Sequence, residues 1–176
     1  MARLAAGWRS VDSALMERMA QLEPQDFALR SDSHMPVWAI LAHLAGARIY
    51  WLCGILEQPG VESTPFDGSG EGWEDHLDMP HSKEDVIGAL ESTWGVVETW
   101  LNGWTATRLE EEFQRTGLDG VTRRQNHHTV LVRLLTHEGY HAGELSLILM
   151  MHGKDGIDPW RRLQMEPVAT STPRTS

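Results

Sequence analysis

The sequence predicts an all-α protein that folds as an up-and-down four-helix bundle. Apolar residues recur at intervals of three and four in four stretches of about 20 residues each, the spacing of a helix with one buried face. Residues that begin or end helices separate these stretches, and no clear strand pattern precedes the last of them. Four helices of this length pack most simply as a bundle.

The first two helices are predicted at residues 8–22 and 37–57. In the first, the apolar positions are Trp8, Val11, Leu15, Met19 and Leu22, and Pro24 ends the pattern. The second follows Pro36, a residue suited to a first helical turn. Because residues 37–57 are apolar on nearly every side, we expect this helix at the centre of the bundle.

A long irregular segment separates the second helix from the third. Residues 58–80 are rich in Gly, Pro, Ser and acidic residues, which predicts a loop that can serve as a lid. The third helix begins at Ser82, because Ser82 and Asp85 have the spacing of a capping box. Its apolar residues continue at helical spacing from Val86 to Trp104.

The fourth helix is predicted at residues 127–152, where Gly153 ends it. Before it, residues 109–126 contain Asp119-Gly120 and Thr122, which indicate a turn or a small hairpin. We therefore predict a single helical domain over residues 1–157. The Pro/Thr/Ser-rich residues 158–176 are expected to form a disordered tail.

Charge and cysteine content exclude several classes of protein. The 25 acidic and 15 basic residues give a net charge of −10, which disfavours nucleic acids and anionic membranes as partners. Cys53 is the sole cysteine, so neither an internal disulfide nor a cysteine-based metal cluster is expected. No secretory leader and no apolar stretch of the ~18 residues that span a membrane is evident. We expect a soluble cytoplasmic protein, and its eight tryptophans and apolar first helix favour a homodimer.

The sequence His-Glu-Gly-Tyr-His places His137 and His141 one turn apart on the fourth helix. H-E-x-x-H is the motif of zinc proteases, in which the histidines bind zinc and the glutamate acts as base. The continuation of that motif is absent, because Glu144 and Leu147 stand where glycine and a third histidine are needed. A later glutamate ligand would have to be Glu166, at the edge of the tail. A bundle also lacks the sheet that such proteases use, so the third ligand should come from another helix.

His43 is the candidate for that third ligand. It lies in the middle of the most apolar helix, between small residues that let another helix approach closely. On a helical wheel of ~100° per residue, His137 and His141 share the core-facing stripe, whereas Glu138 lies one step away from it. A single core histidine is more often simply hydrogen-bonded, but three in one layer would each need a partner. Three imidazoles with a vacant position form an open site that suits Zn²⁺, Ni²⁺ or Fe²⁺.

At these residues the chain resembles the DinB/YfiT-like family of proposed metalloenzymes, a DNA-damage-inducible four-helix family distinct from the polymerase of that name. The resemblance covers about residues 5–152, and Ala142, Gly143 and Glu144 match the small residue, Gly, and Gln or Glu that follow the last ligand in the family. It implies that His43, His137 and His141 bind a divalent metal, zinc or nickel foremost, with Fe or Mn as alternatives. Arginine is common in the family where Ala142 stands, so a charge on the substrate side is missing here.

The resemblance also implies a reaction. Some relatives resemble transferases that deprotonate a low-molecular-weight thiol such as mycothiol or bacillithiol. We therefore predict a metal-dependent thiol S-transferase that acts on a thiol and an electrophilic substrate in the stress response or detoxification. The alternatives are a metal-assisted small-molecule hydrolase and a non-catalytic metal-binding stress protein.

Other polar residues near the motif are candidates for supporting roles. Glu138 and Tyr140 are candidates for catalysis, and Glu144 and Arg133 for positioning the ligands or binding substrate, although Arg133 could instead pair with Glu144. The remaining histidines outside the start of the fourth helix are expected at the surface or in loops; these are His34, His76, His81 and His152. For His76 and His81 the alternative is that they reach the site from the loop.

Overall fold

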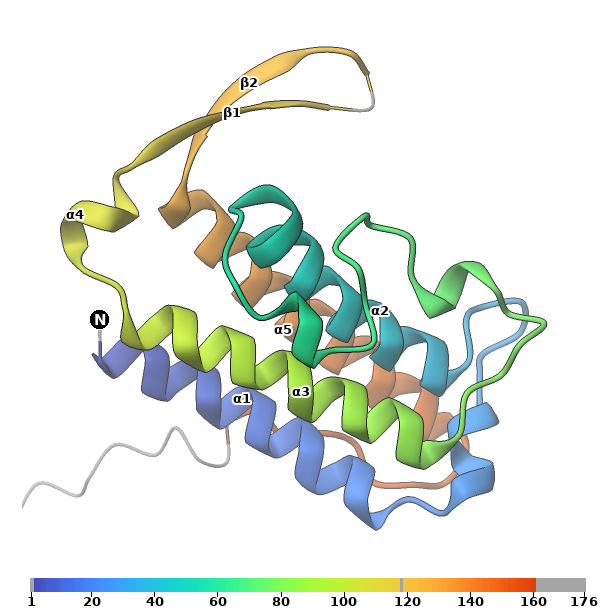
Figure 1. The fold of residues 1–176 in the computed structure, drawn as a ribbon. Helices are drawn as coiled ribbons and strands as arrows, with labels where there is room; N and C mark the ends of the chain where they lie inside the picture. Colours follow the sequence, from blue (N-terminus) through green and yellow to red (C-terminus); the bar gives the residue numbers. More distant parts are fainter. Residues whose placement is uncertain (1, 118, 161–176) are drawn as a thin grey trace, which may run out of the picture.

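Four long helices form the body of the protein in a computed structural model that describes residues 2–117 and 119–160 (Figure 1). Helix α2 packs against both α3 and α5, and α1 packs against the same two helices. The four predicted helices are thus present, with the bounds α1 (Ala2–Gln21), α2 (Val37–Ile49), α3 (Lys83–Asn102) and α5 (His127–Met151). Residues 161–176, most of the predicted tail, lie outside the described part of the chain.

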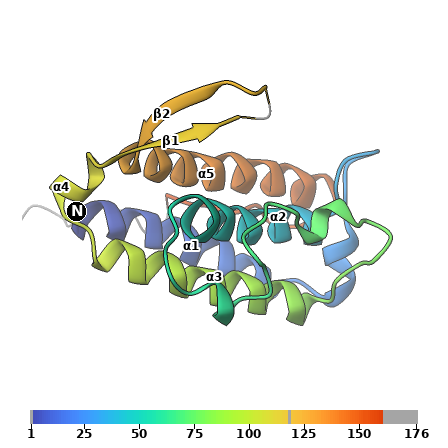
Figure 2. The ribbon, with the colours of Figure 1, turned by 45° about the horizontal axis from the view of Figure 1, so that its top comes forward.

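The protein is not purely α-helical, because a two-stranded antiparallel hairpin precedes the last helix. Strand β1 (Glu112–Thr116) pairs with β2 (Thr122–Asn126), and the short helix α4 (Ala106–Leu109) joins α3 to it. Nearly every strand position is polar, so the alternation that predicts a strand is missing. In both views the hairpin lies on the side of α2 and α5, away from α1 and α3 (Figures 1 and 2).

Local signals in the sequence set the ends of the long helices. The capping box is confirmed, since Asp85 N donates to Ser82 Oγ and Ser82 N donates to the Asp85 carboxylate, each at 3.1 Å. Asn126 caps α5 by accepting a hydrogen bond from Thr129 N at 2.9 Å. Gly153 follows α5 with a φ of 72°, a left-handed conformation that glycine adopts at little cost.

The second helix widens towards its C-terminal end and the loop packs against it. Residues Tyr50–Ile55 continue α2 as a π-helix, a local geometry that is frequent at functional sites. A Cβ atom added to Gly54 would lie 2.1 Å from the carbonyl oxygen of Gly68, so the backbones of the helix and the 58–80 loop are in direct contact. Short 3₁₀ turns lie before α2 (Pro24–Ala28) and within this loop (Val61–Ser63 and Trp73–Asp75).

The central helix contains an apolar stretch of membrane-spanning length, contrary to the expectation from the sequence. Among the described residues, Val37–Ile55 is one helical stretch long and apolar enough to cross a membrane by length and composition. In the bundle, 61% of that window is buried against the other elements. Since a buried core helix passes the same test, the stretch is weak evidence for a membrane span.

A buried ion cluster joins the four long helices at the guanidinium group of Arg48. From α2, Arg48 donates to Asp12 of α1 and Glu138 of α5, at 2.7 Å each, and to the Leu90 carbonyl of α3 at 3.1 Å. The other carboxylate oxygen of Glu138 accepts a hydrogen bond from Trp8 Nε1 at 2.6 Å. Buried charges are tolerated only when they are paired and hydrogen-bonded, so these contacts specify how the helices lie against one another.

Replacing Arg48 will test this role. Arg48→Ala leaves Asp12 and Glu138 buried without their counter-charge, so we expect the free energy of unfolding to fall by about 3–5 kcal/mol in urea titrations followed by circular dichroism. Arg9→Ala is the control, because Arg9 pairs with Glu98 on the surface, where both side chains are over a third exposed. Such exposed pairs contribute at most about 1 kcal/mol. Similar losses in the two variants would contradict the anchoring role of Arg48.

Candidate metal centre

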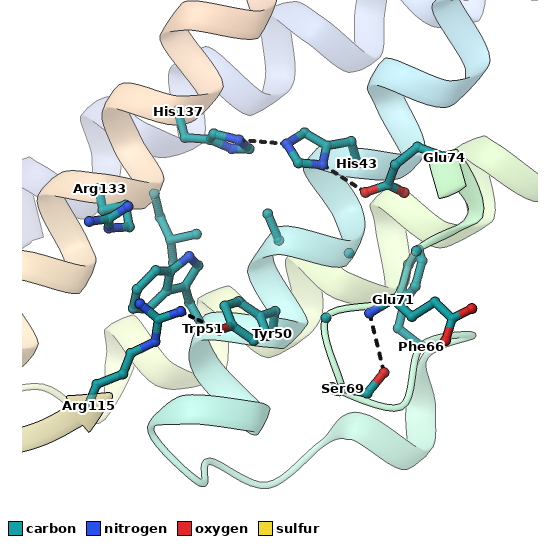
Figure 3. A pocket seen from close by; sticks show the side chains of 16 residues that line it. His43, Tyr50, Trp51, Phe66, Ser69, Glu71, Glu74, Arg115, Arg133 and His137 are labelled. Carbon is teal, nitrogen blue, oxygen red and sulfur yellow. Dashed lines mark hydrogen bonds and ion pairs between the residues drawn. The ribbon is translucent and has the colours of Figure 1, made fainter. Parts of the chain in front are cut away.

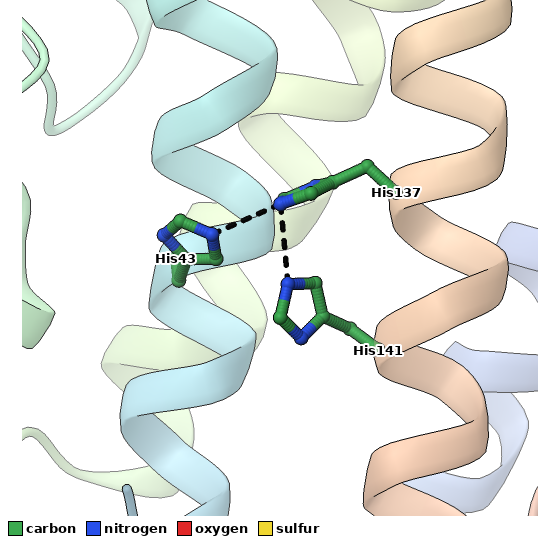
Figure 4. A group of neighbouring side chains, drawn as sticks. All are labelled: His43, His137 and His141. Carbon is green, nitrogen blue, oxygen red and sulfur yellow. Dashed lines mark hydrogen bonds between the residues drawn. The ribbon is translucent and has the colours of Figure 1, made fainter.

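His43, His137 and His141 come together between α2 and α5 (Figure 4). Nε2 of His137 lies 2.9 Å from Nε2 of His43 and 3.1 Å from Nε2 of His141. The three ligand atoms all lie within 4.8 Å of one another. In a tetrahedral zinc site with Zn–N bonds of ~2.0 Å, ligand nitrogens are about 3.3 Å apart. The three side chains that the sequence singled out therefore form a cluster of the size that can hold a metal ion.

Two carboxylates orient the outer imidazoles of this cluster. Nδ1 of His43 lies 2.7 Å from Oε1 of Glu74, and Nδ1 of His141 lies 2.5 Å from Oε2 of Glu144. Since a carboxylate accepts hydrogen bonds, we assign the ring proton of both histidines to Nδ1. This pattern, in which a carboxylate supports a metal-binding histidine, is common in metalloproteins.

This tautomer leaves a lone pair on Nε2 of His43 and of His141, and both point at His137. A neutral His137 carries at most one proton on Nε2, so it cannot donate a full hydrogen bond to the lone pairs of both His43 and His141. A metal ion would accept a lone pair from each of the three rings. The donor set therefore fits a metal ion better than it fits a hydrogen-bonded cluster.

His137 and His141 are in the protonation state that binds metals. Burial, assisted by His141 and His43, lowers the pKa of His137 to about 4, and burial also lowers the pKa of His141. At neutral pH both rings are uncharged, so they need not release a proton to bind a metal. Burial opposes ionisation of Glu144, but hydrogen bonds from His34 and His141 hold its pKa below the usual value.

Neither Glu138 nor Tyr140, the candidates for catalysis, is among the residues that line the cavity next to His43 and His137. The two carboxylate oxygens of Glu138 are hydrogen-bonded to Trp8 and Arg48 in the core, and burial raises the pKa of Glu138. A role as base would require Glu138 to leave the ion cluster that joins the helices. Tyr140 is 70% exposed, and its ring lies edge-on to His141 with centroids 4.9 Å apart.

Glu144 and Arg133 do not pair with each other. Glu144 contacts both His141 Nδ1 and His34 Nε2. His34, expected at the surface, is therefore linked to His141 through this carboxylate. Arg133 instead lies over the ring of Trp51, 4.7 Å from its centroid. His76 pairs with Glu71, and His81 stacks on Trp73, so neither of these loop histidines joins the cluster.

A cavity of about 420 Å³ opens beside the histidines (Figure 3). His43 and His137 form one side of it, and Tyr50, Trp51 and Phe66 supply aromatic surface. The loop segment 68–72 and Glu74 form another wall, so the irregular 58–80 loop contributes directly to the site. A cavity of this size and character suits a small organic molecule.

The sequence did not predict several residues of this site: the charged Glu74 and Arg115, and the aromatic Tyr50, Trp51 and Phe66. Glu74 lies in an acidic loop that has no regular pattern of apolar residues. The sequence therefore gives no indication that Glu74 lies next to His43. Arg115 lies on β1 of the small hairpin, one of the two alternatives predicted for residues 109–126, but nothing in the sequence directed its side chain towards the histidines. The only local signal near either residue is the turn at Asp119-Gly120.

Comparisons with known proteins relate the chain to one superfamily. The sequence profile of the DinB superfamily matches residues 2–145. The crystal structure of a DinB-like protein from Bacillus cereus ATCC 10987 is similar, with a TM-score of 0.59 and 15% sequence identity over 87% of this chain and 93% of that chain. At this identity the likeness shows the fold alone. A search of functionally curated proteins found no match.

Removing the charge that supports His43 should weaken metal binding. In Glu74→Gln, the neutral amide holds the His43 ring less firmly, and we expect the dissociation constant for Zn²⁺ to rise about 10- to 100-fold in a chelator competition assay. Glu71→Gln is the matched control, since Glu71 lies on the same loop and pairs with His76. Unchanged affinity in Glu74→Gln would show that this carboxylate does not support the ligand.

Proposed function

The chain belongs to the DinB superfamily, and from that premise we propose that it is a metal-dependent transferase that joins a low-molecular-weight thiol to an electrophile. The observation that carries the proposal is the convergence of three imidazole nitrogens beside a cavity of substrate size. We propose Zn²⁺ or Ni²⁺ as the metal, with Fe²⁺ or Mn²⁺ as alternatives, because imidazole ligands suit the first three of these.

The metal and the protein would make separate contributions to this reaction. A divalent ion held by three imidazoles keeps a coordination position open and lowers the pKa of a thiol or water molecule that occupies it. In the transfer, a sulfur–carbon bond forms, the bond from that carbon to its leaving group breaks, and the thiol proton passes to solvent. No carboxylate base is required, which agrees with the position of Glu138 in the core.

The side chains around the histidines would hold the site in one arrangement. Glu74 and Glu144 keep the proton of His43 and His141 on Nδ1, so that Nε2 of both rings stays directed at one point. Trp51 and Phe66 present apolar surface to the cavity, against which an organic substrate can pack and displace water. This combination favours a small-molecule reaction over proteolysis.

Metal analysis combined with a thiol titration tests the proposal. We expect about one metal ion per chain in the purified protein and its loss in His43→Ala, whereas the control His76→Ala, on the exposed loop, retains it. Adding mycothiol or bacillithiol to the Co²⁺-substituted protein should produce a new sulfur-to-metal absorption band. The loaded protein should also accelerate transfer of the thiol to monochlorobimane, with release of chloride.

Each step of this experiment can fail separately. Full metal content in His43→Ala would show that the third ligand is wrongly assigned. Bound metal without any response to thiols would exclude the transferase and leave a metal-assisted hydrolase or a non-catalytic metal-binding stress protein.

A homodimer and a cytoplasmic location stay predictions. Exposed apolar side chains on α5, namely Leu147, Met150 and Met151, support a dimer because burying them would remove apolar surface from water. Sedimentation velocity of the purified protein checks this prediction, and a monomer at all concentrations would contradict it.

A further inference from the structure

Two guanidinium groups lie against one tryptophan in the cavity beside the histidines (Figure 3). Arg115 of β1 and Arg133 of α5 lie 4.9 Å and 4.7 Å from the ring centroid of Trp51. Arg115 Nη2 also donates a hydrogen bond to the hydroxyl group of Tyr50, at 2.6 Å. The hairpin and the metal-binding helix thus each direct one cation to the same aromatic surface.

Neither guanidinium is neutralised within the described part of the chain. The other arginines of the hairpin both have carboxylate partners, since Arg123 pairs with Asp119 at 2.6 Å and Arg124 with Glu112 at 3.4 Å. No carboxylate of residues 2–117 or 119–160 forms an ion pair with Arg115 or Arg133. The protein has a net charge of −10, but two arginines without a carboxylate partner among the described residues make this part of the cavity locally positive.

Guanidinium groups that stack on an aromatic ring keep their N–H edges available. Stacking is a favourable contact for arginine, and the planar fork of donors matches the two oxygens of a carboxylate. Charges are distributed unevenly around the cavity, because Glu74 stands next to His43 whereas the two arginines stand beside Trp51 (Figure 3). An anionic group in the cavity would therefore be attracted to the arginines and repelled by Glu74.

We propose that the cavity binds an organic substrate with a carboxylate at one end, which Arg115 and Arg133 hold, while its apolar part lies along Trp51 and its other end faces the histidines. Only the reaction at that other end rests on the proposed function, because the arginines and Trp51 can bind a carboxylate without a metal. The proposal also explains the polar hairpin, which brings Arg115 to the cavity.

A titration with a matched pair of ligands tests this assignment in metal-free and Zn²⁺-loaded protein. The probes are 3-phenylpropionate and 3-phenylpropionamide, which have the same shape but differ in charge. Chemical shifts of the tryptophan indole N–H groups report binding, including binding in the millimolar range. The variants are Arg115→Gln and Arg133→Gln, with Arg124→Gln as the control on the same hairpin, where 69% of the side chain is exposed.

We expect the carboxylate to bind metal-free and Zn²⁺-loaded protein. The amide should bind at least about tenfold more weakly, because hydrogen bonds to charged groups are stronger than those to neutral groups. Arg115→Gln and Arg133→Gln should each reduce the affinity for 3-phenylpropionate by a similar factor. Arg124→Gln should leave this affinity unchanged. Equal affinity for the two probes, unchanged affinity in both arginine variants, or no binding would overturn the proposal.

The metal-free arm separates this inference from the proposed function. If the carboxylate binds only the Zn²⁺-loaded protein, the metal and not the arginine pair holds it, and this inference is wrong while the metal site stands. If the carboxylate binds as expected but the protein takes up no Zn²⁺, the arginine site stands and the proposed function fails.

Discussion

The buried guanidinium group of Arg48 is the contact on which the arrangement of the four long helices depends. It reaches α1 through Asp12, α3 through the Leu90 carbonyl and α5 through Glu138. A cation without exposure to water requires partners in fixed positions, so the cluster restricts both the spacing and the rotation of the helices. Apolar packing alone would tolerate several rotations of helices that are apolar on most sides.

Rotation of α5 matters most, because His137 and His141, the proposed metal ligands on this helix, flank Glu138. Successive residues of a helix differ in direction by ~100°, so holding Glu138 towards Arg48 turns His137 and His141 away from the core cluster. These two histidines then meet His43, which lies on α2 as Arg48 does. The glutamate of the H-E-x-x-H motif therefore holds the helices in position here. In zinc proteases the same glutamate acts as the general base.

Local periodicity predicted the long helices and the histidine cluster, because one helical face is set by residues three and four positions apart. The residues that the sequence did not reveal depend on tertiary contacts. Glu74 meets His43 from an irregular loop, and Arg115 reaches the cavity from strands with a polar pattern. Arg48 looks like an isolated cation in an apolar helix, and its partners lie 36, 42 and 90 positions away.

We expect His43, His137 and His141 to bind one metal ion while Glu138 stays bonded to Arg48. An anomalous difference map, collected from crystals of the purified protein at the absorption edge of its metal, tests both parts together. We expect a single peak within bonding distance of the three Nε2 atoms, with Glu138 in the core cluster. A peak bonded to Glu138, or the absence of any peak between α2 and α5 after metal loading, would contradict the account.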